Sequence, residues 1–261
     1  MRNQPKATLL NKTKGLQPGK AAGLQSGKTV ERGHKQAVQA LRAHANPVKA
    51  KTSAGFFKDS VKDVFLGVPT PVLRKLAKQF YTLPLADVRK LMHSGVHEER
   101  SLAHAILRLR FEAAYKKDEA EQKRLFDFYI KNRGAIRAWD GVDDSAPYIV
   151  GRHLLERDKK LLYALARAPR LWDRRIAMVS TWWFIRQGQV ADTLKLAEIL
   201  LRDQEDLIHK ATGWMLREVG KKDLRALKQF LDRHKHKMPR TALRYAIERF
   251  SEKERQQYLQ K

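Results

Sequence analysis

The sequence contains no cysteine. This absence excludes disulfides, thiolate zinc sites, iron–sulfur clusters and a thiol nucleophile, and it suits a reducing cytoplasm. The chain also lacks a run of about 18 apolar residues, so no membrane-spanning segment is expected. Its basic N-terminus lacks the apolar stretch of a secretory signal. No glycine-rich phosphate loop, HExxH motif or GxSxG motif is present, which excludes the enzyme classes that depend on them.

Acidic residues are also scarce. The 261 residues include 28 Asp and Glu against 54 Lys and Arg, and the formal net charge is +26. Such an excess is informative about partners rather than about fold. A phosphate backbone is the usual partner of so basic a surface, and an anionic membrane or an acidic protein is the weaker alternative. We therefore expect a protein that binds nucleic acid and not a membrane.

Residues 1–35 have the composition of a tail, rich in Gly, Gln, Lys and Thr. Such a segment cannot bury enough apolar area to offset its ordering entropy, so we expect it to be disordered. It is a solvated extension, a basic arm that adds nonspecific DNA affinity, or both. The tail carries +7 of the +26, so residues 36–261, the single predicted domain, still carry +19.

The rest of the chain has a helical pattern. Apolar residues recur at intervals of three and four in LRKLAKQF (73–80), RSLAHAILRLRF (100–111) and LKLAEILL (194–201). Short breaks separate these runs, among them VPTP (68–71), LP (83–84), APR (168–170) and MPR (238–240). No convincing alternating strand is present, so the predicted fold class is all-α with many short helices.

A weak internal repeat places a basic residue and a small residue ahead of an apolar helix. Arg175, Lys210 and Arg240 mark three of these starts, 35 and 30 residues apart. This period fits stacked helix pairs, which curve and leave a long concave face. The repeated cations would then line one surface, unless they are ordinary solvated helix starts.

The segment RAWDGVDDSAPYIVG (137–151) is unusual because it concentrates carboxylates in a very basic chain. If it is helical, Trp139 and Asp143 are four residues apart and share a face, whereas Asp140 lies off that face. A carboxylate on a DNA-binding surface repels phosphates, so it needs another purpose. The alternative is that Asp143 or Asp144 caps the next helix.

Two further segments combine tryptophan with arginine. LWDRRIAMVSTWWF (171–184) contains Trp182 and Trp183, of which at least one is expected to pack in the core. HKATGWMLREVGKKD (209–223) places Trp214 and Arg217 on one helix face, and Trp214 is the better candidate for a surface aromatic. His93 and His97 are four residues apart, but no third ligand is evident, so no metal or other cofactor is expected.

At these residues the chain resembles the AlkD-like family of DNA alkylation-repair glycosylases, from about residue 38 to about residue 258. Four stretches carry the resemblance, namely FFKDSVKDVFLGVPTPVLRKLAK (56–78), AWDGVDDS (138–145), LWDRRIAMV (171–179) and IHKATGWMLREVGK (208–221). The resemblance implies a right-handed superhelix of HEAT-like antiparallel helix pairs. It also implies that Asp143 is the catalytic carboxylate, that Trp139 and Trp214 are aromatic walls, and that Arg175 is the nearby cation. Phe56 stands where the family often has Tyr, so a hydrogen bond from that hydroxyl is missing.

The resemblance further implies hydrolysis of the N-glycosidic bond of cationic N3- or N7-alkylated purines in duplex DNA, which leaves an abasic site. No lysine is placed in the segment to form a Schiff base, so we expect a monofunctional enzyme that acts as a monomer, in a bacterial cytoplasm at the nucleoid. The alternatives are a nonenzymatic helical-repeat nucleic-acid binder and a protein-binding scaffold; the latter does not explain the charge. The expected DNA contacts are Lys58, Arg174, Arg175, Lys210, Arg217 and Arg240.

Overall fold

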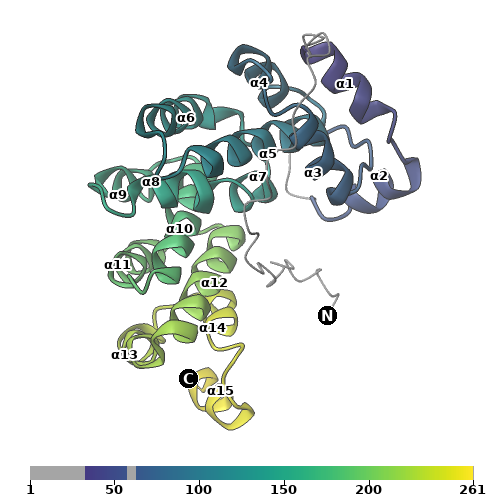
Figure 1. Cartoon of the computed structure of the whole chain (residues 1–261). Coiled ribbons are helices and arrows are strands. Elements are labelled where there is room, and N and C mark those ends of the chain that lie inside the picture. The colour runs from purple at the N-terminus through teal and green to yellow at the C-terminus, as the bar shows by residue number, and fades with distance from the viewer. Residues whose placement is uncertain (1–32, 58–62, 261) are drawn as a thin grey trace.

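The computed structural model describes residues 33–57 and 63–260 (Figure 1). This described part is helical, and its one β-bridge joins Val64 to Val96. The predicted all-α class is confirmed. No described helix has both the length and the apolar character needed to cross a bilayer. Lys58 and residues 1–32 of the predicted tail lie outside the described residues, and the tail's last two residues, His34 and Lys35, already belong to the first helix.

The first half of the chain forms α1 (His34–Arg42), α2 (Pro47–Ala54), α3 (Thr70–Gln79), α4 (Leu85–Met92), α5 (His97–Ala114), α6 (Glu119–Asn132), the 3₁₀ turn η1 (Arg133–Ala135), α7 (Trp139–Asp143), the π-helical turn η2 (Pro147–Gly151) and α8 (Arg152–Leu154). The second half forms α9 (Lys160–Leu165), α10 (Leu171–Arg186), α11 (Ala191–Leu200), α12 (Asp206–Lys222), α13 (Leu224–His234), α14 (Arg240–Ala246) and α15 (Glu252–Leu259).

Proline and side-chain caps explain where many of these helices begin. Pro69, Pro84 and Pro239 are the N-cap residues of α3, α4 and α14. Proline suits a helix start because a missing N–H is not needed there. Asp118 caps α6 through the Glu121 amide. The predicted breaks at 68–71, 83–84, 168–170 and 238–240 are therefore confirmed as helix boundaries.

The helices form two rows that curve together (Figure 1). One row runs through α3, α5, α10, α12 and α14, and the other through α4, α6, α9, α11 and α13. In the first row α3 packs on α5, α10 on α12 and α12 on α14, and η2 and α7 contact both α5 and α10. Arg175, Lys210 and Arg240 lie near the starts of α10, α12 and α14, so the predicted repeat corresponds to stacked units. The right-handed sense of the superhelix stays a prediction.

Glycine permits two close approaches between helices. A Cβ at Gly151 would clash with the carbonyl oxygen of Ser180, and a Cβ at Gly213 would clash with that of Ala242. These positions let η2 approach α10 and let α12 approach α14. The first approach matters most, because it holds the segment 139–154 against both α5 and α10.

Candidate active site

The short helix α7 lies between α5 and α10 and presents two carboxylates in different directions. Trp139 and Asp143 are its first and last residues, so the predicted i, i+4 relation on one face is confirmed. The hydroxyl of Tyr129 lies 2.8 Å from that of Ser145, and Ser145 donates to the Gly141 carbonyl. This buried chain ties the end of α7 to α6 and restricts the orientation of the carboxylates.

Asp143 forms a bidentate ion pair with Arg175. Arg175 Nε lies 3.0 Å from Oδ1, and Nη2 lies 2.8 Å from Oδ2. The two side chains are 11% and 6% exposed. Burial raises the pKa of Asp143 above its ordinary value, although the charge and hydrogen bonds of Arg175 oppose that shift. The carboxylate is therefore held in one orientation in a poorly solvated place, where its charge acts strongly.

The same arginine connects α7 to the next repeat. Arg175 Nη1 donates to the carbonyl oxygen of Leu207 at 2.6 Å, in the first turn of α12. Trp214 follows seven residues later and therefore lies on the same face of α12 as Leu207. Trp214 is only 8% exposed, so its expected position as a surface aromatic is wrong. Trp139 is partly exposed.

The alternative of helix capping is wrong for both residues. The Asp143 carboxylate binds Arg175, and Ala146, not an aspartate, precedes η2 as its N-cap. Asp144 is exposed and makes no capping bond. Its crowded surroundings and the charges of Asp140 and Asp143 raise its pKa to about 6, although Arg108 acts in the opposite direction.

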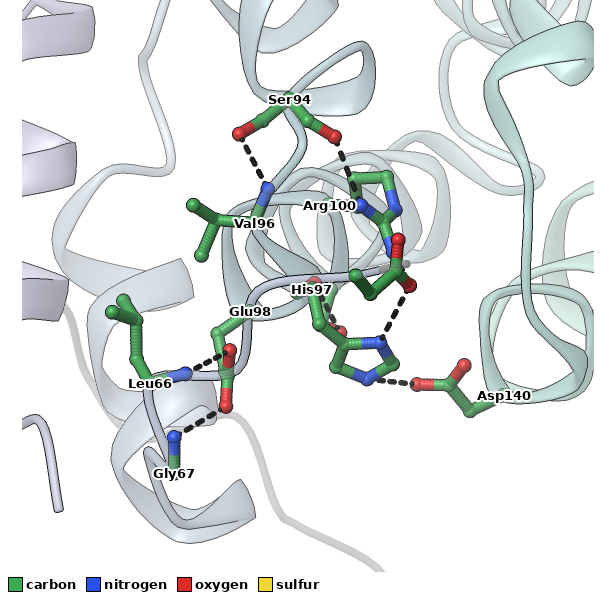
Figure 2. A network of polar contacts seen from close by, with 10 residues as sticks. Leu66, Gly67, Ser94, Val96, His97, Glu98, Arg100 and Asp140 are labelled. Carbon is green, nitrogen blue, oxygen red and sulfur yellow. Dashed lines mark hydrogen bonds and ion pairs between the residues drawn. The ribbon is translucent and has the colours of Figure 1, made fainter. Parts of the chain in front are cut away.

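Asp140 leaves α7 on the other side and belongs to a second polar network (Figure 2). Its Oδ2 lies 3.0 Å from Nε2 of His97, and the His97 Nδ1 lies 3.7 Å from Asp63, which pairs with Arg100. Burial acts to lower the pKa of His97, but the hydrogen bond and charge of Asp140 outweigh it and raise that pKa. Burial opposes ionisation of Asp140, yet His97 lowers its pKa overall. Asp140 is therefore a fixed structural partner of His97. A substitution of Asp140 would disturb this pairing, so it is not a suitable control for a substitution of Asp143.

An aromatic cluster connects this network to Trp139. Phe57 is stacked on Trp139, with ring centroids 5.2 Å apart and planes 11° apart, and it also contacts His97 at 4.5 Å. The ring of Phe65 stacks on His97 from another side at 4.7 Å. Phe56, by contrast, is 43% exposed. Of these two neighbours, Phe57 is the residue that contacts Trp139 and His97.

His97 is the residue whose role the sequence least revealed. Its spacing from His93 suggested at most a weak metal pair, but His93 is exposed and His97 lies between two carboxylates. Among residues 33–57 and 63–260, no group of three or more acidic or histidine side chains is arranged to hold a metal ion. A His near the start of a helix in the pattern VHEER was the available signal.

The predicted phosphate-binding cations of the second half are bonded within the chain. Arg174 pairs with Asp203 at 2.6 Å, and Lys210 pairs with Asp206 at 2.7 Å. Arg217 pairs with Glu248, and Arg240 donates to the Leu259 carbonyl at 2.8 Å. Arg175 is buried with Asp143, so its position suits a partner of the carboxylate rather than a free phosphate contact.

Together these features define a class: an all-α repeat protein whose chain brings a buried carboxylate–arginine pair and two tryptophan-bearing helices to one place. The family model of DNA alkylation repair enzymes matches residues 37–250, and the chain belongs to that family. Its fold is similar to a solved structure described as a predicted DNA alkylation repair enzyme from Enterococcus faecalis, with a TM-score of 0.64 and 19% sequence identity. That similarity covers 80% of this chain and 98% of the other. A search of curated protein sequences finds no match.

Proposed function

We propose that the protein is a monofunctional DNA glycosylase that removes cationic alkylated purines, such as N3- and N7-methylpurines, from duplex DNA. The observation that carries the proposal is the Asp143–Arg175 pair. A buried, fully oriented carboxylate on a strongly basic protein disfavours phosphate binding at that point, so its presence there suits a chemical task. Membership of the DNA alkylation repair enzyme family supports the proposal.

The chemistry required is modest, because an alkylated purine already carries a positive charge. Its glycosidic bond is weak, and the leaving base needs no proton. The enzyme has to stabilise the cation that develops on the sugar and to orient a water molecule. An ionised Asp143 can perform both tasks, by the logic that stabilises oxocarbenium ions in sugar hydrolysis.

Arg175 and Trp139 support this role of Asp143. Arg175 holds the carboxylate by two hydrogen bonds and favours its ionised form against the effect of burial. The ring of Trp139, which is partly exposed, favours a cationic sugar or base through its quadrupole. The charged partner of Asp143 is an arginine, and a guanidinium does not form a Schiff base with an abasic sugar, which fits hydrolysis by water.

The rate should depend on pH through Asp143. Burial raises its pKa, so lowering the pH through that raised pKa protonates the carboxylate and removes the counter-ion. A methylated purine with a fixed charge does not titrate with it. Base release should therefore decline on the acid side, and a rate that instead rose toward low pH would indicate acid catalysis by a protonated group.

The direct test is base release. Duplex DNA treated with a methylating agent is incubated with the protein, and free methylpurines and abasic sites are measured. We expect methylpurine release with an equal amount of intact abasic sites. Strand cleavage coupled to release would contradict the monofunctional assignment. Tight, salt-sensitive duplex binding without any release would favour the nonenzymatic helical-repeat binder.

A further inference from the structure

We propose that a face of stacked arginines beside the candidate active site binds the DNA phosphates that flank the lesion. This proposal deepens the proposed function and rests on it. The face, which we name the arginine–aromatic track, comprises Arg108 of α5, Tyr148 of η2, Arg152 of α8, and Trp182, Trp183 and Arg186 of α10. None of these residues is among the DNA contacts that the sequence suggested.

Each arginine of the track lies over a ring. The guanidinium carbon of Arg108 lies 3.3 Å from the centroid of the Tyr148 ring. That of Arg152 lies 3.9 Å from Trp183, and that of Arg186 lies 4.9 Å from Trp182. The three rings also contact one another, with centroid separations of 5.7 to 6.3 Å. Cations and aromatic rings therefore alternate across α5, the adjoining η2 and α8, and α10.

Arg152 and Arg186 have few polar partners within the described chain, whereas Arg108 Nε donates to Glu112 at 3.0 Å. Arg152 Nε is buried without a hydrogen-bond partner, and its one ionic contact is a long one, 3.8 Å to Glu112. Burial lowers the pKa of Arg152. An arginine side chain is so basic that it still carries its positive charge at neutral pH. Arg186 is exposed and forms no ion pair within the described residues. A guanidinium stacked on a ring keeps its edge available, and that edge matches a phosphate with two parallel hydrogen bonds.

The track lies close to α7. Arg108 is near enough to Asp144 to lower its pKa, and Tyr148 and Arg152 follow Asp144 along one nearly continuous helical segment. At a rise of 1.5 Å per residue, Arg152 is about 12 Å from Asp144 along that axis. Successive nucleotides of a strand advance about 3.4 Å along the duplex axis. By this spacing Arg152 lies within about four nucleotides of a base held at Asp143.

A cavity of about 290 Å³ extends the track at the far end of α5. Tyr115, Lys116, Lys117 and Arg152 line it on one side. Two glutamates also line it, but Glu119 is neutralised by Arg157 at 2.7 Å. A positively charged groove is the arrangement with which proteins follow a nucleic-acid backbone. A repeat protein that used these arginines only for packing would have no need to direct lysines into the same cavity.

The test measures the salt dependence of duplex binding for single Arg→Gln variants. Arg152→Gln and Arg186→Gln each remove one cation of the track, and Arg225→Gln removes one exposed cation from α13 in the other row as the matched control. For each track variant we expect the magnitude of the log–log slope to decrease by roughly 1, and affinity to fall about eightfold near 0.1 M salt. The control should retain the wild-type slope.

Thermal unfolding of the same variants separates binding from packing. Arg186 is exposed, so Arg186→Gln should unfold at the wild-type temperature. Its duplex binding should still show the smaller salt slope. A lower unfolding temperature with an unchanged slope in both track variants would overturn the proposal. If wild-type protein releases methylpurines but the track variants bind as it does, the track fails while the glycosylase proposal stands. If wild-type protein releases no base yet the slopes change as expected, the glycosylase proposal fails while the track stands as a DNA-binding surface.

Discussion

The basic residues at the starts of α10, α12 and α14 differ from those of the arginine–aromatic track in one respect. Arg174 and Lys210 are paired closely with carboxylates, whereas Arg152 and Arg186 lie over aromatic rings, Arg152 with a 3.8 Å contact to Glu112 and Arg186 with no ion pair within the described residues. Both sets contribute equally to the net charge. The difference shows that net charge counts cations but does not tell which of them are available to a ligand.

The paired cations connect neighbouring parts of the fold. Arg174 joins α10 to Asp203, which precedes α12, and also donates to the carbonyls of Ala168 and Pro169. Arg217 joins α12 to Glu248, just beyond α14. These bonds hold successive units in register. In the track, Arg108 pairs with Glu112 at 3.0 Å and lies near Asp144, and Arg152 lies 3.8 Å from Glu112. Arg186 has no ion pair within the described residues, so a ligand that brings negative charge would complete its surroundings.

The largest effect expected from breaking a paired cation is at Arg175. Arg175→Gln leaves the buried Asp143 carboxylate without its counter-ion, and loss of one partner of a buried pair costs about 3–5 kcal/mol. Urea unfolding of the variant measures this directly. A loss below about 1 kcal/mol would mean that the pair is solvated and not buried as the structure has it.

Arg174→Gln should have an intermediate effect, and on stability rather than on DNA binding. Asp203 is 6% exposed, so it would lose a charged hydrogen-bond donor in a buried place, at a cost of about 1–3 kcal/mol. The salt slope of duplex binding should stay at the wild-type value. A slope lowered by roughly 1 with unchanged stability would place Arg174 among the available cations and erase the distinction between the two regions.

The smallest expected effect is the pH dependence of stability that comes from the His97–Asp140 pair. The pKa of His97 is raised in the folded protein, so its contribution to stability is full below the unfolded value of about 6.5 and is lost as pH rises through the folded value. The free energy of unfolding should therefore decline over that interval for the wild-type protein. His97→Gln should show a flatter profile, and identical profiles for the two proteins would contradict the His97–Asp140 pairing.

Local patterns predicted much of the fold and part of the site. Prolines and apolar spacing located the helix boundaries, and the i, i+4 relation of Trp139 and Asp143 follows from helix geometry alone. Trp182 packs in the core as expected, at 9% exposed. The position of Arg175 beside Asp143, 32 residues away, was reached only through the family resemblance.

The missed features all depend on contacts between distant segments. His97 meets Asp140 and Asp63 from other parts of the chain, and Phe57 meets Trp139 across more than 80 residues. The adjacent residues Phe56 and Phe57 have the same side chain, so the sequence alone does not indicate which ring packs against the site. The pairing of Arg174 with Asp203 is equally nonlocal, so sequence spacing could identify the cation but not its partner.

Asp143→Asn provides the most direct test of the central claim, that Asp143 stabilises the developing sugar cation. The rate of methylpurine release from duplex DNA is measured at saturating enzyme, with Asp144→Asn as the control that removes the same charge from the adjacent exposed position. We expect Asp143→Asn to release base roughly 10²–10³-fold more slowly. Its duplex binding should be equal or tighter, because a repulsive charge is gone. Asp143→Asn that releases methylpurine at the wild-type rate would contradict the account.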